Sequence, residues 1–255
     1  MIIFPAIDLY EGRVVRLTQG DYMRRRDYAL SPLEAAEAFL DSGCAAIHVV
    51  DLEGAKAGEP RHLEVLSQIA ALGLFVQYGG GLRSAEAVAD ALSAGAGRVM
   101  AGSLVFKEIE QAETLAARFG EKIMAAIDIK EKKVVHSGWL EATNLSAKEA
   151  VSTLAAKGFT SFLVTQTERD GMMEGTEAAD YAPLSASGRF IAAAGGVTTP
   201  RDISNLAAVG VNAAIIGKSL YEGRMTICEA IAAAQMQNFA NARKILPYFY
   251  KNSAR

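Results

Sequence analysis

The 255-residue sequence has few of the features that mark membrane or secreted proteins. It holds two cysteines, Cys44 and Cys228, which are too few and too far apart for a disulfide framework or a cysteine-based metal site. No apolar run reaches about 18 residues, and the start of the chain carries no basic group, so we expect neither a membrane span nor a signal peptide. The expected location is a reducing cytoplasm.

The sequence also lacks an excess of positively charged residues. The chain has 26 Lys and Arg against 29 Asp and Glu, a formal net charge of −3. Nucleic acids and anionic membranes usually bind clustered basic residues, so we expect neither as a partner. The three histidines have no metal-ligand spacing, which predicts that no metal is bound. His48 lies within an apolar run and is expected to be a packed or outward-facing histidine.

Short apolar runs rich in Val, Ile and Ala alternate with longer amphipathic segments, and this alternation predicts eight strand–helix units. The connection over residues 10–30 is unusually long and predicts a short hairpin or a functional loop. The predicted strands span 2–9, 46–51, 74–78, 98–101, 123–129, 161–165, 190–194 and 213–217. The predicted helices span 32–43, 61–72, 84–95, 107–119, 146–157, 178–186, 200–209 and 222–237.

The two halves of the sequence resemble each other. Residues 6–15 (AIDLYEGRVV) and 126–135 (AIDIKEKKVV) are identical at six of ten positions, 120 residues apart. Later motifs repeat at a similar offset: Gly80-Gly81 matches Gly195-Gly196 and Gly102 matches Gly217 at 115, and Val50-Asp51 matches Val164-Thr165 at 114. Self-similarity over several motifs in one order indicates duplicated structure.

This symmetry favours an α/β fold in which residues 1–255 form a single closed (β/α)8 TIM barrel built from two half-barrels. A doubly wound open sheet is the other architecture that the alternation allows, but it gives no reason for the repeat.

Asp8 and Asp128 each end a predicted strand and occupy the same place in the repeat. In a (β/α)8 barrel the carboxyl ends of the strands form the floor of the active site, and strands 1 and 5 lie opposite each other. Two facing carboxyl groups suit general acid and base chemistry on one substrate. The alternative is that each carboxylate only caps a helix or a loop, and the repeat argues against it.

Glycine-rich turns follow predicted strands 3, 4, 7 and 8. Glycine allows a ligand to approach the backbone closely, and amides at a helix N-terminus can hold phosphate without a basic surface. Two symmetric pairs of such turns predict an elongated substrate with a phosphate at each end, although tight turns alone could also require glycine. The candidate residues are Gly80, Gly81, Gly102, Ser103, Gly195, Gly196 and Gly217, with local positive charge from Arg83 and Lys218.

Three further residues are candidates because of their places in loops. Trp139, the one tryptophan, follows strand 5 and could stack on a planar heterocycle or anchor the core. Thr165 ends strand 6 and Asp170 follows in its loop, where a hydroxyl and a carboxylate could orient a substrate.

Together these motifs resemble the phosphoribosylformimino-aminoimidazole carboxamide ribotide isomerases of histidine biosynthesis. The resemblance runs nearly end to end. It rests on FPAIDLYEGRVVRLTQGDY (4–22), IHVVDLEGAKAG (47–58), YGGGLRS (78–84), AAIDIKEKKVVHSGW (125–139), TERDGMMEG (167–175) and AAGGVTTPRDI (193–203).

The resemblance implies an Amadori rearrangement, in which an aminoaldose carrying two phosphoribosyl groups becomes an aminoketose without a cofactor. It implies that Asp8 is the general base at C2 and that Asp128 is the general acid at the ribose ring oxygen. An acid of this kind needs a pKa above the usual value of about 3.9. The other implied contacts are Thr165 at the reacting ribose, Trp139 over the ligand, Arg83 along it, and Arg16 and Asp170.

One position departs from some relatives, which carry a basic residue where this chain has Ser137. Two alternatives to a dedicated isomerase remain at this stage: an enzyme that also accepts phosphoribosylanthranilate, and a non-catalytic phosphosugar-binding barrel. We expect a small bis-phosphorylated substrate as the partner and a monomer as the oligomeric state.

Overall fold

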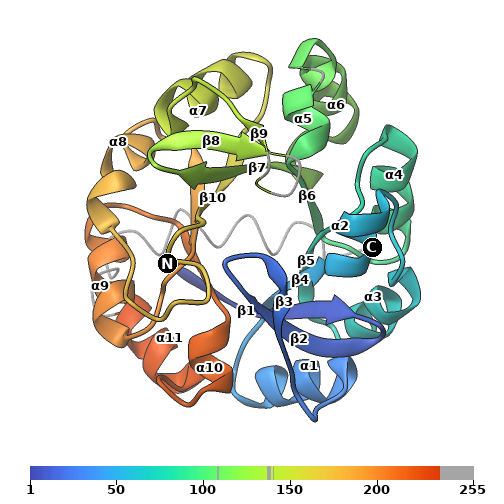
Figure 1. Cartoon of the computed structure of the whole chain (residues 1–255), viewed down its shortest axis with the longest axis vertical. Helices are drawn as coiled ribbons and strands as arrows, with labels where there is room; N and C mark the ends of the chain where they lie inside the picture. The colour runs from blue at the N-terminus through green and yellow to red at the C-terminus, as the bar shows by residue number, and fades with distance from the viewer. Residues whose placement is uncertain (108, 137–138, 140, 236–255) are drawn as a thin grey trace.

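In the computed structural model, residues 1–107, 109–136, 139 and 141–235 are described. Eight parallel strands form a closed ring, because β12 pairs with β1 and β10 pairs with β7. Figure 1 shows the ring with helices around it. The predicted (β/α)8 barrel is therefore confirmed. In ring order the strands are β1 (Ile2–Tyr10), β4 (Ala46–Asp51), β5 (Phe75–Gly79), β6 (Arg98–Ala101), β7 (Ile123–Lys130), β10 (Ser161–Gln166), β11 (Phe190–Ala194) and β12 (Ala213–Ile216).

Helices form the outer layer. Their N-termini follow the sequence signals, because Ser31, Ser84, Ser146 and Thr199 each accept a hydrogen bond from the amide three residues on. The described helices are α1 (Pro32–Asp41), α2 (Leu52–Ala57), α3 (Leu63–Ala70), α4 (Ala85–Ser93), α5 (Ser103–Lys107), α6 (Ala112–Phe119), α7 (Ala147–Ala156), α8 (Ala182–Ser185), α9 (Pro200–Ala208), α10 (Lys218–Tyr221) and α11 (Ile227–Gln235), with 3-10 turns η1 (Ile109–Gln111), η2 (Gly120–Lys122) and η3 (Ala178–Asp180).

Three predicted helices differ from the structure. The helix predicted over 107–119 is divided into α5, η1 and α6, and the one over 178–186 into η3 and α8. The helix predicted over 222–237 begins later, at Ile227, and positions 236 and 237 lie outside the described residues. The short helices α2 and α10 were not predicted, because four to six residues are too few to show helical periodicity.

Two antiparallel extensions project from the barrel. The long connection predicted over residues 10–30 is a hairpin of β2 (Arg13–Thr18) and β3 (Asp21–Asp27), which confirms the expectation. In the second half β8 (Lys133–His136) and β9 (Glu141–Ala142) extend β7 in the same manner.

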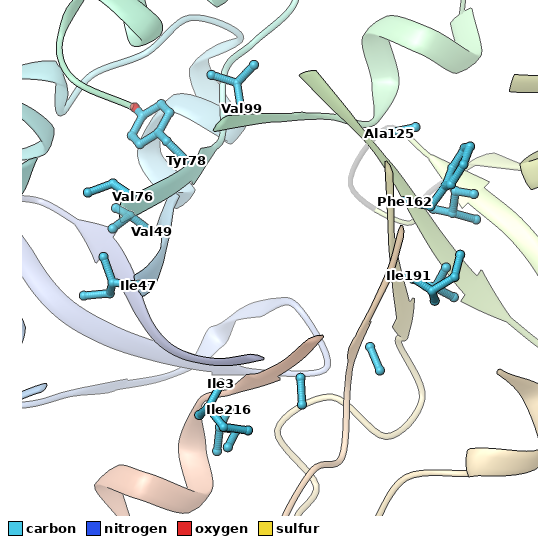
Figure 2. Packing of buried hydrophobic residues seen from close by; sticks show 14 of the residues in the cluster. Ile3, Ile47, Val49, Val76, Tyr78, Val99, Ala125, Phe162, Ile191 and Ile216 are labelled. Carbon is cyan, nitrogen blue, oxygen red and sulfur yellow. The ribbon is translucent and has the colours of Figure 1, made fainter. Parts of the chain in front are cut away.

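The strands divide their side chains between two cores. Side chains such as Ile47, Val49 and Val76 point outward and pack under the helices, as Figure 2 shows for the larger cluster. The alternate positions, among them Phe4 and Met124, form a smaller cluster inside the ring. Strands buried on both faces explain why the sequence runs are almost continuously apolar.

The pairing registers reproduce the sequence repeat and correct one part of it. Asp8 is opposite Val15 in the β1–β2 pair, and Asp128 is opposite Val135 in the β7–β8 pair, 120 residues later. In the next strand, however, Val50 lies beside Asp8 as Thr165 lies beside Asp128. The counterpart of Thr165 is therefore Val50 rather than Asp51, and the offset of 114 inferred from sequence was wrong by one residue.

Candidate active site

A cavity of about 580 Å³ opens at the carboxyl ends of the barrel strands. Every residue predicted as a site residue lines it, although their roles stay predictions. The set consists of Asp8, Arg16, Gly80, Gly81, Arg83, Gly102, Ser103, Asp128, Trp139, Thr165, Asp170, Gly195, Gly196, Gly217 and Lys218.

Asp8 faces the cavity from β1 beside a buried cation. Arg16, on the paired strand β2, places Nη1 2.7 Å from Asp8 Oδ2 and also donates to the backbone carbonyl of Ala6. The guanidinium lies over the ring of Tyr221, 5.2 Å from its centre. Burial raises the pKa of Asp8, while the charge and the hydrogen bond of Arg16 act in the opposite direction. Arg16 therefore favours the ionised carboxylate.

Asp128 faces the same cavity from β7, four strands away from β1 in either direction around the ring. Burial raises its pKa above the usual value, and hydrogen bonds from the side chains of Trp139 and Thr165 partly oppose the rise. These partners are neutral, unlike the arginine beside Asp8. The direction of the shift is the one that a general acid needs, but Asp8 shares it, so the role of Asp128 stays a prediction.

Asp170 brings a third carboxyl group to the mouth. Its pKa is raised to about 7, first by burial and then by the charge of Asp8, with a further contribution from Asp128. Arg16 and Lys218 act against this rise. Because Asp170 is coupled to both strand-end carboxyl groups, the ionisation of all three belongs to one electrostatic site.

Loops from distant parts of the chain converge above these carboxyl groups. The turn of the β2–β3 hairpin is tied to the loop after β10, because Gln19 donates its backbone amide to the Asp170 carbonyl. Lys218 donates to the Gly171 carbonyl at 2.8 Å. The ring of Trp139 lies directly against Gly20, where a Cβ atom would be 2.6 Å from it. These contacts enclose one side of the mouth.

The glycine turns have the same geometry in the two half-barrels. Gly80, at φ 111°, is so close to Asp51 that an added Cβ would lie 2.1 Å from the Asp51 carbonyl oxygen. Gly195, at φ 87°, is as close to Gln166, at 2.3 Å. Both conformation and space therefore require glycine. The glycines of both turns line the cavity.

Arg83 and Ser103 flank the turns after β5 and β6. Arg83 Nη2 donates to the Ala55 carbonyl at 2.9 Å, and its guanidinium covers Gly58. Ser103 begins α5 directly after Gly102. Arg83 thus links the turn after β5 to the segment that contains α2.

A buried network around Asp51 was not predicted from the sequence. Its carboxylate accepts hydrogen bonds from the Gly54, Arg61 and His62 amides, from the Tyr78 hydroxyl at 2.8 Å and from His62 Nδ1 at 2.9 Å. Burial alone would raise the pKa of Asp51, but these donors hold it below its usual value. Asp51 thus fixes the loop on which Gly80 and Gly81 pack.

His48 was expected to be packed or outward-facing, and the structure bears this out in part. The side chain is buried, but it points into the barrel and lines the floor of the cavity. Its strand position next to Val50, which lies beside Asp8, was the signal that could have revealed this.

Ser137, the departure from some relatives, lies outside the described residues. Within the described part of the chain no helix is long and apolar enough to cross a membrane. The same residues contain no cluster of three or more His, Cys, Asp or Glu side chains that could hold a metal ion. The absence of a metal cofactor stays a prediction.

A family model described as "Histidine biosynthesis protein" matches residues 2–226. The chain belongs to this family. Its members in the comparison include a protein of Caldicellulosiruptor saccharolyticus, 40% identical over 235 residues, which cover 91% of this chain and 99% of that relative. A protein of Moorella thermoacetica is 40% identical over 239 residues, covering 92% and 98%. One of Bacillus pumilus is 39% identical over 234 residues, covering 90% and 96%.

All three relatives are named 1-(5-phosphoribosyl)-5-((5-phosphoribosylamino)methylideneamino)imidazole-4-carboxamide isomerase. The histidine biosynthesis family thus includes isomerases of the kind that the sequence motifs resembled. The comparisons do not favour the two alternatives, a second activity on phosphoribosylanthranilate and a non-catalytic barrel.

The glycine turns give a first testable prediction. Gly80→Ala and Gly195→Ala should each lower the free energy of unfolding by about 3 kcal/mol or more, because the new Cβ would overlap a backbone carbonyl. Gly73→Ala is the matched control: Gly73 also has positive φ, at 84°, but no atom lies within 4 Å of its added Cβ. It should cost about 1 kcal/mol. Equal thermal unfolding shifts for Gly73→Ala and Gly80→Ala would contradict the argument.

Asp170 gives a second prediction, on pH. Its folded-state pKa of about 7 lies above the ordinary value of 3.8, so its contribution to stability is present below pH 3.8 and is lost as the pH rises through 7. Asp170→Asn should therefore be more stable than wild type at pH 8, by about 2 kcal/mol after allowance for screening by water in the cavity.

The measurement is the thermal unfolding midpoint between pH 4 and pH 8 in buffers without phosphate. The stability difference between Asp170→Asn and wild type should grow with pH and level off above about pH 7. The exposed Asp90→Asn on α4 serves as the control and should show no such rise. A pH-independent difference for Asp170→Asn would refute the assignment.

Proposed function

We propose that the protein catalyses the Amadori rearrangement of the aminoaldose ProFAR to the aminoketose PRFAR in histidine biosynthesis. The observation that carries the proposal is the placement of Asp8 and Asp128 on opposite strands of one cavity, with unlike partners. Family membership and the names of the relatives support the same reaction.

The first step opens the furanose. Asp128, whose protonated form is favoured by burial, gives a proton to the ribose ring oxygen while the bond from this oxygen to C1 breaks. The lone pair of the substituent nitrogen forms the C=N bond of a Schiff base. Thr165 and Trp139 orient the carboxyl group for this transfer.

The second step moves the double bond. Asp8, whose ionised form is favoured by the adjacent Arg16, removes the proton from C2, and the electron pair forms a C1–C2 double bond as C=N becomes C–N. The resulting enol takes up a proton at C1 and loses the proton of its C2 hydroxyl, and so becomes the ketone. The two aspartates thus have distinct tasks although they are equivalent in the repeat.

The two phosphates bind at opposite sides of the mouth in this proposal. One lies on the turns with Gly80, Gly81, Gly102 and Ser103, and the other on those with Gly195, Gly196, Gly217 and Lys218. Their backbone amides supply the donors that a chain with a net charge of −3 does not supply as a basic surface. Residues 1–255 act as a single-domain, cytoplasmic monomer without cofactor.

Substitution of the aspartates tests the roles. Asp8→Asn and Asp128→Asn should each reduce turnover of the aminoaldose by at least about a hundredfold, because each removes a proton-transfer group and keeps its shape. Product affinity, measured by calorimetry, should change little. Asp90→Asn, an exposed substitution, should have wild-type turnover. Near-wild-type turnover in either active-site variant would overturn the acid–base assignment.

A further inference from the structure

A chain of three polar side chains crosses the barrel interior below the cavity. Arg98, Gln77 and His48 occupy partner positions on the adjacent strands β6, β5 and β4. Arg98 donates to Gln77 Oε1 from Nη2 at 2.7 Å and from Nε at 3.2 Å. Gln77 Nε2 lies 3.1 Å from His48 Nδ1. All three residues are buried, so these contacts link groups that water does not reach freely.

The donors and acceptors of these three side chains allow one arrangement of protons. A guanidinium only donates, so the atom of Gln77 that faces Arg98 must be its carbonyl oxygen. The amide nitrogen of Gln77 then faces His48 and donates, both to Nδ1 and to Met100 Sδ at 3.2 Å. Nδ1 must accept and cannot carry a proton. The proton of a neutral His48 is therefore on Nε2.

His48 Nε2 is the ring nitrogen left for a ligand. Among the described residues, the hydrogen bond that the structure gives to this ring is the one at Nδ1. The side chain lines the cavity floor, one inward position below the level of Asp8, since His48 pairs with Ala6 and Val50 pairs with Asp8. An Nε2–H group of His48 is therefore a candidate donor to a ligand in this cavity.

The surrounding charges keep His48 neutral. Burial is the first cause that lowers its pKa, to about 3, and the positive charges of Arg16 and Arg98 add to the effect. Asp8 is the nearest acidic group on the neighbouring strand, but Arg16 is paired with it. The ring therefore does not titrate near neutral pH, and it can neither take up a proton from the substrate nor act as the acid.

We propose that Gln77 and Arg98 are positioning residues that hold His48 as a neutral Nε2–H donor to a sugar oxygen of the substrate. The identity of the substrate rests on the proposed function; the tautomer does not. The competing role for the same residues is purely structural, since Arg98 also lies between the rings of Phe75 and Phe190, at 5.7 and 4.7 Å from their centres. A structural role would affect stability alone.

The direct test is nitrogen NMR of the histidines in the wild-type protein without substrate. The chain has three histidines, so His48→Gln identifies the signals of His48 by their loss. We expect Nε2 to be protonated and Nδ1 to be unprotonated from about pH 5.5 to pH 8.5, with no titration. A protonated Nδ1, or titration within this range, would overturn the proposal.

Gln77→Glu links the tautomer to catalysis. The carboxylate keeps the shape and still accepts from Arg98, but it cannot donate to Nδ1, so the His48 proton should move to Nδ1 or the ring should become charged. We expect kcat/KM to fall by at least about tenfold, mainly through kcat, because one hydrogen bond to the transition state is lost. Gln68→Glu, an exposed change on α3, is the matched control and should keep wild-type kinetics.

The outcomes separate the two claims. A Gln77→Glu protein with a changed His48 proton and unchanged turnover would show that the ring does not act on the substrate and would reject the proposal. A wild-type protein with the expected tautomer but no turnover of the aminoaldose would instead refute the proposed function. If Gln77→Glu unfolds, Arg98→Met replaces it in the test. Loss of the guanidinium frees the Gln77 side-chain amide to rotate, so both His48 tautomers should be present. A single Nε2–H form in Arg98→Met would contradict the proposal that Arg98 and Gln77 set the tautomer.

Discussion

Closure of eight strands into a ring is the constraint on which the rest of this structure depends. Strand side chains alternate, so closure sends every second one into a narrow interior. Most of these positions are filled by apolar groups such as Phe4 and Met124. At the carboxyl ends the same alternation turns Asp8 and Asp128 inward, where burial raises the pKa of both while a substrate can still reach them.

The duplication supplies two similar carboxyl groups, Asp8 and Asp128. One position in the strand after β1 gives the two groups different partners. Arg16, eight residues after Asp8, pairs with it. The position eight residues after Asp128 holds His136 instead of arginine. A permanent cation beside Asp8 favours its ionised form. The donors beside Asp128 are neutral, so they oppose less of the rise in pKa that burial causes. An acid and a base can thus arise from one ancestral half-barrel pattern.

The sequence predicted the barrel strands and a set of residues that line the cavity, because apolar runs, the internal repeat and the family resemblance mark them. Strand ends are marked by apolar runs, and Asp8 and Asp128 are marked by the repeat. The network around Asp51 could not be predicted in this way, since His62 and Tyr78 reach it from 11 and 27 residues away. The sequence alignment that matched Thr165 to Asp51 was wrong for a related reason. The register is decided by hydrogen bonding between strands, and a shift of one residue changes every pair.

The tautomer of His48 depends on still more distant information, because Arg98 must first fix the orientation of Gln77. No pattern within one strand contains it. The tautomer can be inferred only once the registers of the adjacent strands are known.

The arrangement of charge also explains how an acidic barrel could process a substrate with two phosphates. Three carboxyl groups, Asp8, Asp128 and Asp170, share the mouth, and an approaching dianion raises the pKa of each. For a general acid this is helpful, since Asp128 must be protonated. For a general base it is harmful, and Arg16 is placed at Asp8, where the opposing charge is needed. Phosphate binding and acid–base chemistry are therefore compatible because Arg16 is paired with Asp8 and not with Asp128.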